Sequence, residues 1–184
     1  MTDGRNNNEK KLLESAIQGE ASAFGLLYDK YQPSIFRFIF LKVSQREEAE
    51  DLTHQVFLSA WQNIEAFQDQ GLPLSSWLYK IARNKVIDHY RTRKPVISLD
   101  NTPDEKLAIA TESSLREIEN RMEIEGVYKA LKQLPTDYQE IIVMRFVEGL
   151  SPKEVSEITG RNHGAVRVLQ FRALRQLKKI LENE

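Results

Sequence analysis

The chain of 184 residues has room for one domain or two small ones, and because it contains no cysteine it can hold neither a disulfide framework nor a thiolate metal site. Its 26 basic and 27 acidic residues nearly cancel, but the basic ones gather in 80–94 and 161–179, where a local patch can still bind nucleic acid. Residues 1–11 are polar, unlike a signal peptide, and no apolar run can span a bilayer, so we expect a cytoplasmic protein without membrane insertion.

The first half of the sequence predicts successive helices, with no sustained strand alternation. A short helix is expected to end at Gly19, and Ser22 is placed to cap the next one. Pro33 is expected to open a further helix that is apolar nearly all round, which is typical of the buried centre of a bundle. Ser44 and Glu47 form a capping-box pattern at the start of the helix that follows.

Two helices of this half have a distinctive outer face. The helix after Ser44 has a mixed outer stripe at helical spacing: Asp51, Gln55, Leu58 and Gln62. After a loop over 66–74, a helix from Ser75 is expected to place an apolar row inward: Trp77, Leu78, Ile81, Ala82, Val86 and Tyr90. The other side of this helix is basic: Lys80, Arg83, Asn84, Ile87, Arg91 and Lys94.

The helical pattern breaks at Pro95. Residues 95–118 are polar and acidic with little periodicity, and they predict a linker or a solvated tether. Periodicity resumes at 119, with two apolar rows: Val127, Ala130, Leu131 and Leu134, then Tyr138, Ile141, Ile142 and Phe146. We therefore expect an all-α chain in which two small helical domains, 15–94 and 119–184, are joined by an acidic linker.

The C-terminal stretch has the pattern of a helix-turn-helix. Ser151, Pro152 and Glu154 predict a capped short helix that Gly160 ends, and Asn162 is placed to cap a longer helix. The longer helix has one apolar row: Val166, Leu169, Ala173, Leu177 and Ile180. Its opposite row is Arg167, Val168, Phe171, Arg172 and Arg175.

The opposite row distinguishes a DNA-reading helix from an ordinary amphipathic one. No acidic residue occurs between Arg161 and Lys179, whereas a merely solvated face usually mixes charges of both signs. The row also exposes Val168 and Phe171, which can contact thymine methyl groups in a DNA groove. The pattern therefore favours a recognition helix over a C-terminal helix with a solvated basic face.

Three stretches resemble bacterial RNA polymerase sigma factors of the sigma-70 family, in the extracytoplasmic-function (ECF) group. They are AEDLTHQVFLSAW at 49–61, SWLYKIARNKVIDHYR at 76–91 and LPTDYQEIIVMRFVEGLS at 134–151. The ECF group fits best because the chain lacks room for the extra middle domain of larger sigma factors. The resemblance implies a protein that binds core RNA polymerase and directs promoter-specific transcription initiation, with no enzymatic activity and no cofactor.

By this resemblance, residues 15–94 are region 2, which binds the clamp helices of the polymerase and opens the −10 box. The stripe that matches the clamp-binding segment is Asp51, Gln55 and Leu58. The family usually has Gln and then an acid where His54 and Gln55 stand. The residues that match the −10 reader are Lys80, Arg83, Asn84, Arg91 and Arg93, and the 66–74 loop matches a pocket for a flipped base.

Several of these residues also have a structural interpretation. Asn84 is either a base-contacting residue or a packing residue. For Asp88 we expect a packing or capping role. Trp77 is expected in the core, because large aromatic residues are buried more often than they serve as stacking platforms.

Residues 119–184 resemble region 4, which reads the −35 box and rests on the polymerase flap. The matching DNA-facing residues are Arg161, Asn162, His163, Arg167, Val168, Phe171 and Arg172. The linker resembles the segment that threads towards the RNA exit channel. An anti-sigma factor is expected as a partner, because a free sigma factor would compete continuously for polymerase.

Two other classes of protein are compatible with parts of the sequence. A helix-turn-helix regulator with a helical sensor domain explains 119–184 but leaves 49–61 and 76–91 unaccounted for. Asp51 and His54 have the carboxylate-x-x-His spacing of helical di-iron enzymes, which need a second such pair. Asp88 and His89 are adjacent and point to different faces of a helix, so we expect neither a metal site nor catalytic residues.

Overall fold

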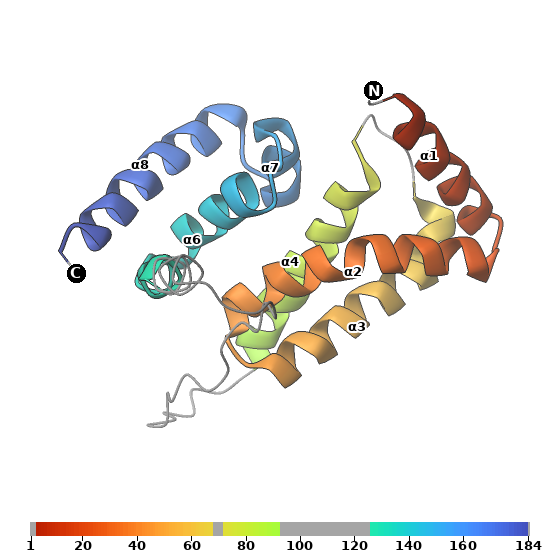
Figure 1. Ribbon diagram of the computed structural model, residues 1–184, viewed down its shortest axis with the longest axis horizontal. Helices are drawn as coiled ribbons and strands as arrows, with labels where there is room; N and C mark the ends of the chain where they lie inside the picture. Colours follow the sequence, from red (N-terminus) through yellow and green to blue (C-terminus); the bar gives the residue numbers. More distant parts are fainter. Residues whose placement is uncertain (1–2, 68–71, 93–125, 184) are drawn as a thin grey trace, which may run out of the picture. The chain divides into compact units, whose positions relative to one another are not determined.

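The computed structural model describes residues 3–67, 72–92 and 126–183, with side chains from residue 8 onward (Figure 1). Every regular element within these ranges is helical, which confirms the predicted all-α fold. The chain divides into two compact units, Met1–Asn101 and Thr102–Glu184. The predicted linker over 95–118 and the predicted −10 residue Arg93 lie outside the described residues.

The first unit contains the helices α1 (Asp3–Ile17), α2 (Ala21–Val43), α3 (Arg46–Asn63) and α4 (Leu74–Thr92), with a short 3-10 turn, η1 (Ile64–Ala66), after α3. Helices α2, α3 and α4 pack against one another, and α1 packs on α2. Their shared core contains fully buried side chains: Leu27, Ile35, Phe38, Ile39, Val56 and Leu78. The helix predicted to be apolar nearly all round is therefore the centre of the bundle.

Helix α2 is one continuous element of 23 residues, so the prediction that Pro33 opens a new helix is wrong. An interior proline lacks its backbone N–H and costs about 3 kcal/mol or more. Here Tyr31 and Ile35, on either side of Pro33, are buried in the bundle. This packing outweighs the preference of proline for the first turn of a helix. The prediction that Ser22 caps this helix is also wrong. Glu20 is the N-cap residue, and its carboxylate accepts a hydrogen bond of 2.8 Å from the Ser22 hydroxyl.

The turn between α2 and α3 also differs from the prediction. Ser44 has a left-handed backbone, with φ of 66°, and its N–H donates to the carbonyl of Phe40 at 2.9 Å, so Ser44 ends α2. Gln45 is the N-cap residue of α3 and makes no side-chain capping bond. The predicted capping box of Ser44 and Glu47 is therefore absent, because the Ser44 backbone terminates the preceding helix.

A carboxylate ties α1 to α2. The Tyr31 hydroxyl donates a hydrogen bond of 2.5 Å to Oε1 of Glu9, and the Lys30 ammonium pairs with the other oxygen of that carboxylate. Burial, together with the hydrogen bond to Glu9, raises the pKa of Tyr31 well above its ordinary value. Gly19 lies between the two helices with φ of 89°, as a glycine that ends a helix does.

The second unit contains a helical segment over 126–132, then α6 (Thr136–Ile142), a π-helical turn η2 (Val143–Val147), α7 (Pro152–Thr159) and α8 (His163–Leu181). Its core joins α6 and α8 with residues before them: Leu131, Leu134, Ile142 and Ala173 are buried, and Tyr138, Leu177 and Ile180 pack against them. None of the helices described in either unit is long and apolar enough to cross a membrane.

The π-turn changes which side chains of this segment are buried. A π-turn is wider than an α-turn, so the residues in it are rotated relative to the α-helical phase of α6. Val143 and Met144 are fully buried, whereas Phe146 is 53% exposed. The prediction that Phe146 belongs to the inward row is therefore wrong.

Candidate DNA and polymerase interfaces

Local hydrogen bonds build the helix-turn-helix. The Ser151 hydroxyl accepts a bond of 3.2 Å from the Glu154 N–H, and the Glu154 carboxylate accepts one of 2.8 Å from the Ser151 N–H. Gly160, with φ of 68°, ends α7, and the Asn162 side chain accepts a bond of 2.8 Å from the Ala165 N–H to start α8. These bonds confirm the predicted capping box and the predicted starts of both helices.

Helix α8 has a packed face and a free face. Val166 and Ala173 are fully buried, and the rest of the predicted apolar row is half-buried: Leu169, Leu177 and Ile180. On the opposite side, Phe171 is 68% exposed and Val168 is 49% exposed. The other residues of that row are exposed cations: Arg167, Arg172 and Arg175. The free face therefore combines positive charge with apolar groups that the fold of this unit does not bury.

The N-terminal end of α8 is less uniformly basic than the sequence indicates. Arg161 pairs with Asp137 of α6 at 2.8 Å, so an acidic group from outside the acid-free stretch neutralises it. His163 is exposed in the first turn of α8. Asn162, predicted to face DNA, is exposed but uses its side-chain oxygen to cap the helix.

A contact that sequence reasoning missed fixes α8 to η2. The Arg145 guanidinium donates a hydrogen bond of 3.0 Å to the side chain of Gln170 and another to the carbonyl of Leu150. Arg145 thus holds α8 and the residue before the helix-turn-helix together. In the sequence, only the position of Arg145 shortly before the capping box indicated this role. Helical spacing could not predict it, because the two partners of Arg145 lie 5 and 25 residues away.

Helix α4 presents the second basic face. Lys80, Asn84 and Arg91 are exposed, and Arg83 is half-buried. Arg91 pairs with the Asp88 carboxylate on its own helix at 3.0 Å, and both side chains are exposed, so this contact is neither packing nor capping. The predicted pocket loop over 66–74 is described only at its two ends.

Two aromatic residues of α4 differ from their predicted positions. Trp77 is half-buried and not in the core, and it meets Phe67 edge-on with 5.3 Å between ring centroids. Tyr90, predicted to point inward, is 49% exposed, and its hydroxyl donates a bond of 2.8 Å to the carbonyl of Lys42. A tyrosine near a helix end gains a partner for its hydroxyl in this position, which an apolar core would deny it.

The predicted polymerase stripe lies on one exposed face of α3. Asp51, Gln55 and Leu58 are all exposed, and the exposed fraction of Leu58 is 50%. Asp51 and His54, considered above as metal ligands, lie exposed on this outer side. No group of three or more metal-binding side chains occurs within the described parts of the chain.

An aromatic groove beside Leu58 was not foreseen from the sequence. It is open, has a volume of about 260 Å³, and Leu58 lines it together with Phe24, Tyr28 and Trp61. The ring centroids of Phe24 and Trp61 are 4.9 Å apart, and these rings are only half-buried. Helical spacing assigns such rings to an inward face, but it cannot show that the neighbouring helix leaves them partly uncovered.

Comparisons with known proteins identify the family. The family model of Sigma-70 region 2 matches residues 27–96, and that of Sigma-70, region 4 matches residues 124–177. The chain is 37% identical over 180 residues to the ECF RNA polymerase sigma factor BldN of Streptomyces coelicolor, covering 95% of this chain and 66% of that protein. It is 31% identical over 183 residues to the RNA polymerase sigma-H factor of Pseudomonas aeruginosa, covering 95% of this chain and 94% of that protein.

The chain belongs to the ECF group of the sigma-70 family. As an ECF sigma factor it directs RNA polymerase in promoter-specific transcription initiation and is not an enzyme. Two solved structures have the same fold. A sigma factor RpoE in complex with the anti-sigma factor NepR from Bartonella quintana is 27% identical, with a TM-score of 0.69, covering 86% of this chain and 96% of that one. CnrH in complex with the cytosolic domain of CnrY is 24% identical, with a TM-score of 0.73, covering 96% and 99%.

Proposed function

We propose that this ECF sigma factor divides promoter recognition between its two units, with boundaries at 15–94, 95–118 and 119–184. Helix α8 reads the −35 box, α4 opens the −10 box, and the outer stripe of α3 binds the clamp helices of core polymerase, in the cytoplasm. One observation carries the proposal: the free face of α8 exposes Phe171 and Val168 among arginines, at the end of a fully capped helix-turn-helix.

For the −35 box, α8 supplies two kinds of contact. Arg167 and Arg172 can neutralise phosphates or bond guanine edges in the major groove. Val168 and Phe171 offer the apolar surface that a thymine methyl group requires. Arg161 is paired with the Asp137 carboxylate, so its contribution to DNA binding is smaller than that of an arginine without an acidic partner.

For the −10 box, the outer face of α4 supplies the contacts. Lys80, Arg83 and Arg91 bring positive charge, and the exposed amide of Asn84 can bond a base edge. Ile87 lies on the same face and is 44% exposed. Mixed basic, polar and apolar surface of this kind suits a DNA strand whose bases have been separated.

The polymerase interface centres on Leu58. Its side chain is half-exposed, follows Asp51 and Gln55 along the stripe and borders the aromatic groove, so a partner helix can bury it while the two polar residues fix the register. The second unit rests on the polymerase flap. An anti-sigma factor that covered Leu58 and the groove would compete with the clamp, and the solved RpoE structure contains an anti-sigma factor.

The test is reconstitution with core polymerase and a promoter library randomised over the −35 and −10 boxes. We expect the chain to bind core polymerase without DNA and to select one promoter class for transcription. Phe171→Ala should change the selected −35 sequence, whereas Leu181→Ala should not, because Leu181 is an exposed residue in the last turn of the same helix. DNA binding without any affinity for core polymerase would instead identify a plain helix-turn-helix regulator.

A further inference from the structure

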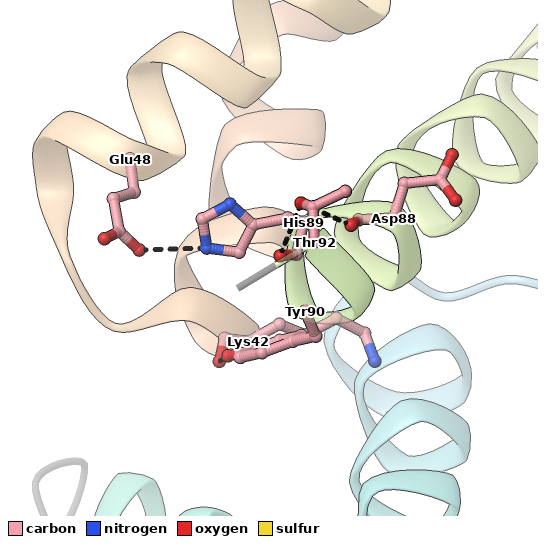
Figure 2. Close-up of polar contacts among 6 residues, drawn as sticks. All are labelled: Lys42, Glu48, Asp88, His89, Tyr90 and Thr92. Carbon is pink, nitrogen blue, oxygen red and sulfur yellow. Dashed lines mark hydrogen bonds and ion pairs between the residues drawn. The ribbon is translucent and has the colours of Figure 1, made fainter. Parts of the chain in front are cut away.

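Two polar contacts hold the C-terminal turn of α4 against the neighbouring helices (Figure 2). Nε2 of His89 lies 3.2 Å from Oε2 of Glu48 in the first turn of α3, and both side chains are less than one-fifth exposed. The hydroxyl of Tyr90 donates to the carbonyl of Lys42 in the last turn of α2. The end of α4 is thus tied to α3 through one side chain and to α2 through the next.

These contacts matter because apolar packing of α4 stops before its last turn. Val86 is the last buried residue of the helix, and all residues after it are exposed except His89, which is half-buried. The Thr92 hydroxyl bonds the carbonyls of Asp88 and His89, at 2.9 and 3.2 Å, and so closes the turn on itself. The contacts to Glu48 and Lys42 therefore fix this turn to the bundle beyond the reach of its apolar packing.

The chemistry of the His89 contact depends on a proton at Nε2. This atom is buried and 3.2 Å from a carboxylate oxygen, close enough for an ion pair but too poorly aligned for a hydrogen bond. An imidazole lone pair at Nε2 would repel the Glu48 carboxylate, whereas a proton there is attracted to it, most strongly in the imidazolium form.

Charged residues beside His89 in the sequence and on α2 have partners of their own. Asp88 and Arg91, which flank His89 on α4, pair with each other at 3.0 Å. Lys42, from α2, places its ammonium over the Phe38 ring, 5.4 Å from the centroid. Glu48 is the charged group that lies against Nε2, at 3.2 Å.

We propose that His89 and Glu48 are positioning residues for promoter opening: their contact fixes the last turn of α4, and with it the side chain of Arg91, for the −10 DNA. Neither residue touches the DNA. The inference rests on the proposed function, in which the outer face of α4 meets the −10 box. Glu48 also lies one helical turn before Asp51, so the contact joins the DNA-facing helix to the helix that carries the polymerase stripe.

The experiment uses the full chain with core polymerase, on a promoter that the wild-type holoenzyme selects from the randomised library. Four variants are compared: His89→Gln, Glu48→Gln, the exchange Glu48→His with His89→Glu, and the control Glu50→Gln. Glu50 lies on the same helix but pairs with Arg46 at the surface. The readouts are affinity for core polymerase, thermal unfolding, and the rate at which −10 thymines become reactive to permanganate.

We expect His89→Gln and Glu48→Gln to slow opening about tenfold, while affinity for core polymerase changes less than about twofold. The exchange variant should recover most of the wild-type rate. Glu50→Gln should keep the wild-type rate.

The two hypotheses fail in different ways. If both single variants fold and open the promoter at the wild-type rate, or the exchange variant folds but recovers nothing, His89 and Glu48 are not positioning residues. If the wild-type holoenzyme opens no promoter in the library, the proposed function fails instead.

Discussion

Replacing Leu58 by glutamate should weaken polymerase binding by about three orders of magnitude without unfolding the first unit. Leu58 is 50% exposed on the outer face of α3, where a glutamate is compatible with the helix and its carboxylate reaches water. The effect on the free energy of unfolding should therefore stay within about 0.5 kcal/mol, as for most surface substitutions. Any loss of polymerase binding would then reflect the interface and not the fold.

The expected loss can be worked out from the exposure of Leu58. Full burial of a leucine side chain contributes about 1.5–3 kcal/mol, so burial of its exposed half contributes about 1 kcal/mol to the complex. An unpaired carboxylate left buried in the interface costs about 3 kcal/mol more. The sum of about 4 kcal/mol corresponds to binding weaker by about 10³-fold.

The assay is a titration of labelled core polymerase with the variant and with a matched control, Leu26→Glu. Leu26 is 56% exposed on α2. It lies two residues from both Phe24 and Tyr28, and because two residues turn a helix by about 200°, it faces away from the groove that those rings line. The control should bind like the wild type. If Leu58→Glu keeps wild-type affinity, or if both variants lose it equally, the α3 stripe is not the specific interface.

Other substitutions test the capping, charge and burial of single residues. Ser151→Ala should lower the stability of the second unit by about 1 kcal/mol in thermal unfolding, and Ser151→Asp, which can still cap, should not. Asp137→Asn should release Arg161 from its ion pair and steepen the salt dependence of −35 binding, measured by fluorescence anisotropy, by about one phosphate contact. Arg172→Ala should reduce this salt dependence by about one phosphate contact. If neither slope changes, these two arginines do not contact DNA phosphates. The pKa of Tyr31 is raised in the folded chain, so the free energy of unfolding of the first unit should fall as the pH rises above about 10. Urea titrations at each pH measure this fall, and it should be smaller in Tyr31→Phe.

The second unit could be predicted closely because its defining bonds are local. Ser151 and Glu154 are three residues apart, and so are Asn162 and Ala165, so the sequence contains both partners of each cap. The exposed row of α8 follows from helical periodicity for the same reason. Propensity and spacing are sufficient where every interaction lies within one helical turn.

The first unit was predicted less well because distant packing decides its helix ends. By local preference, Pro33 would start a helix and Ser44 would cap one. Burial of the surrounding apolar residues instead keeps α2 continuous through Pro33 and ends it at Ser44. The candidate sites show the same limit. The pairing of Arg161 with Asp137 spans 24 residues, and that of Tyr90 with Lys42 spans 48, so neither could be inferred from spacing alone.

The π-turn at Val143–Val147 affects how related sequences should be aligned. A π-turn behaves like one extra residue accommodated within a helix, and here the Glu148 N–H bonds the carbonyl of Val143, five residues earlier, before the capping box begins. A relative with one residue fewer in this segment could form an ordinary α-turn and still reach the same capping serine. An alignment that assumes constant helical phase from α6 to α7 would then equate the exposed Phe146 with a residue that is buried in the relative. Gaps placed within 143–147 would keep solvent-facing positions matched to one another.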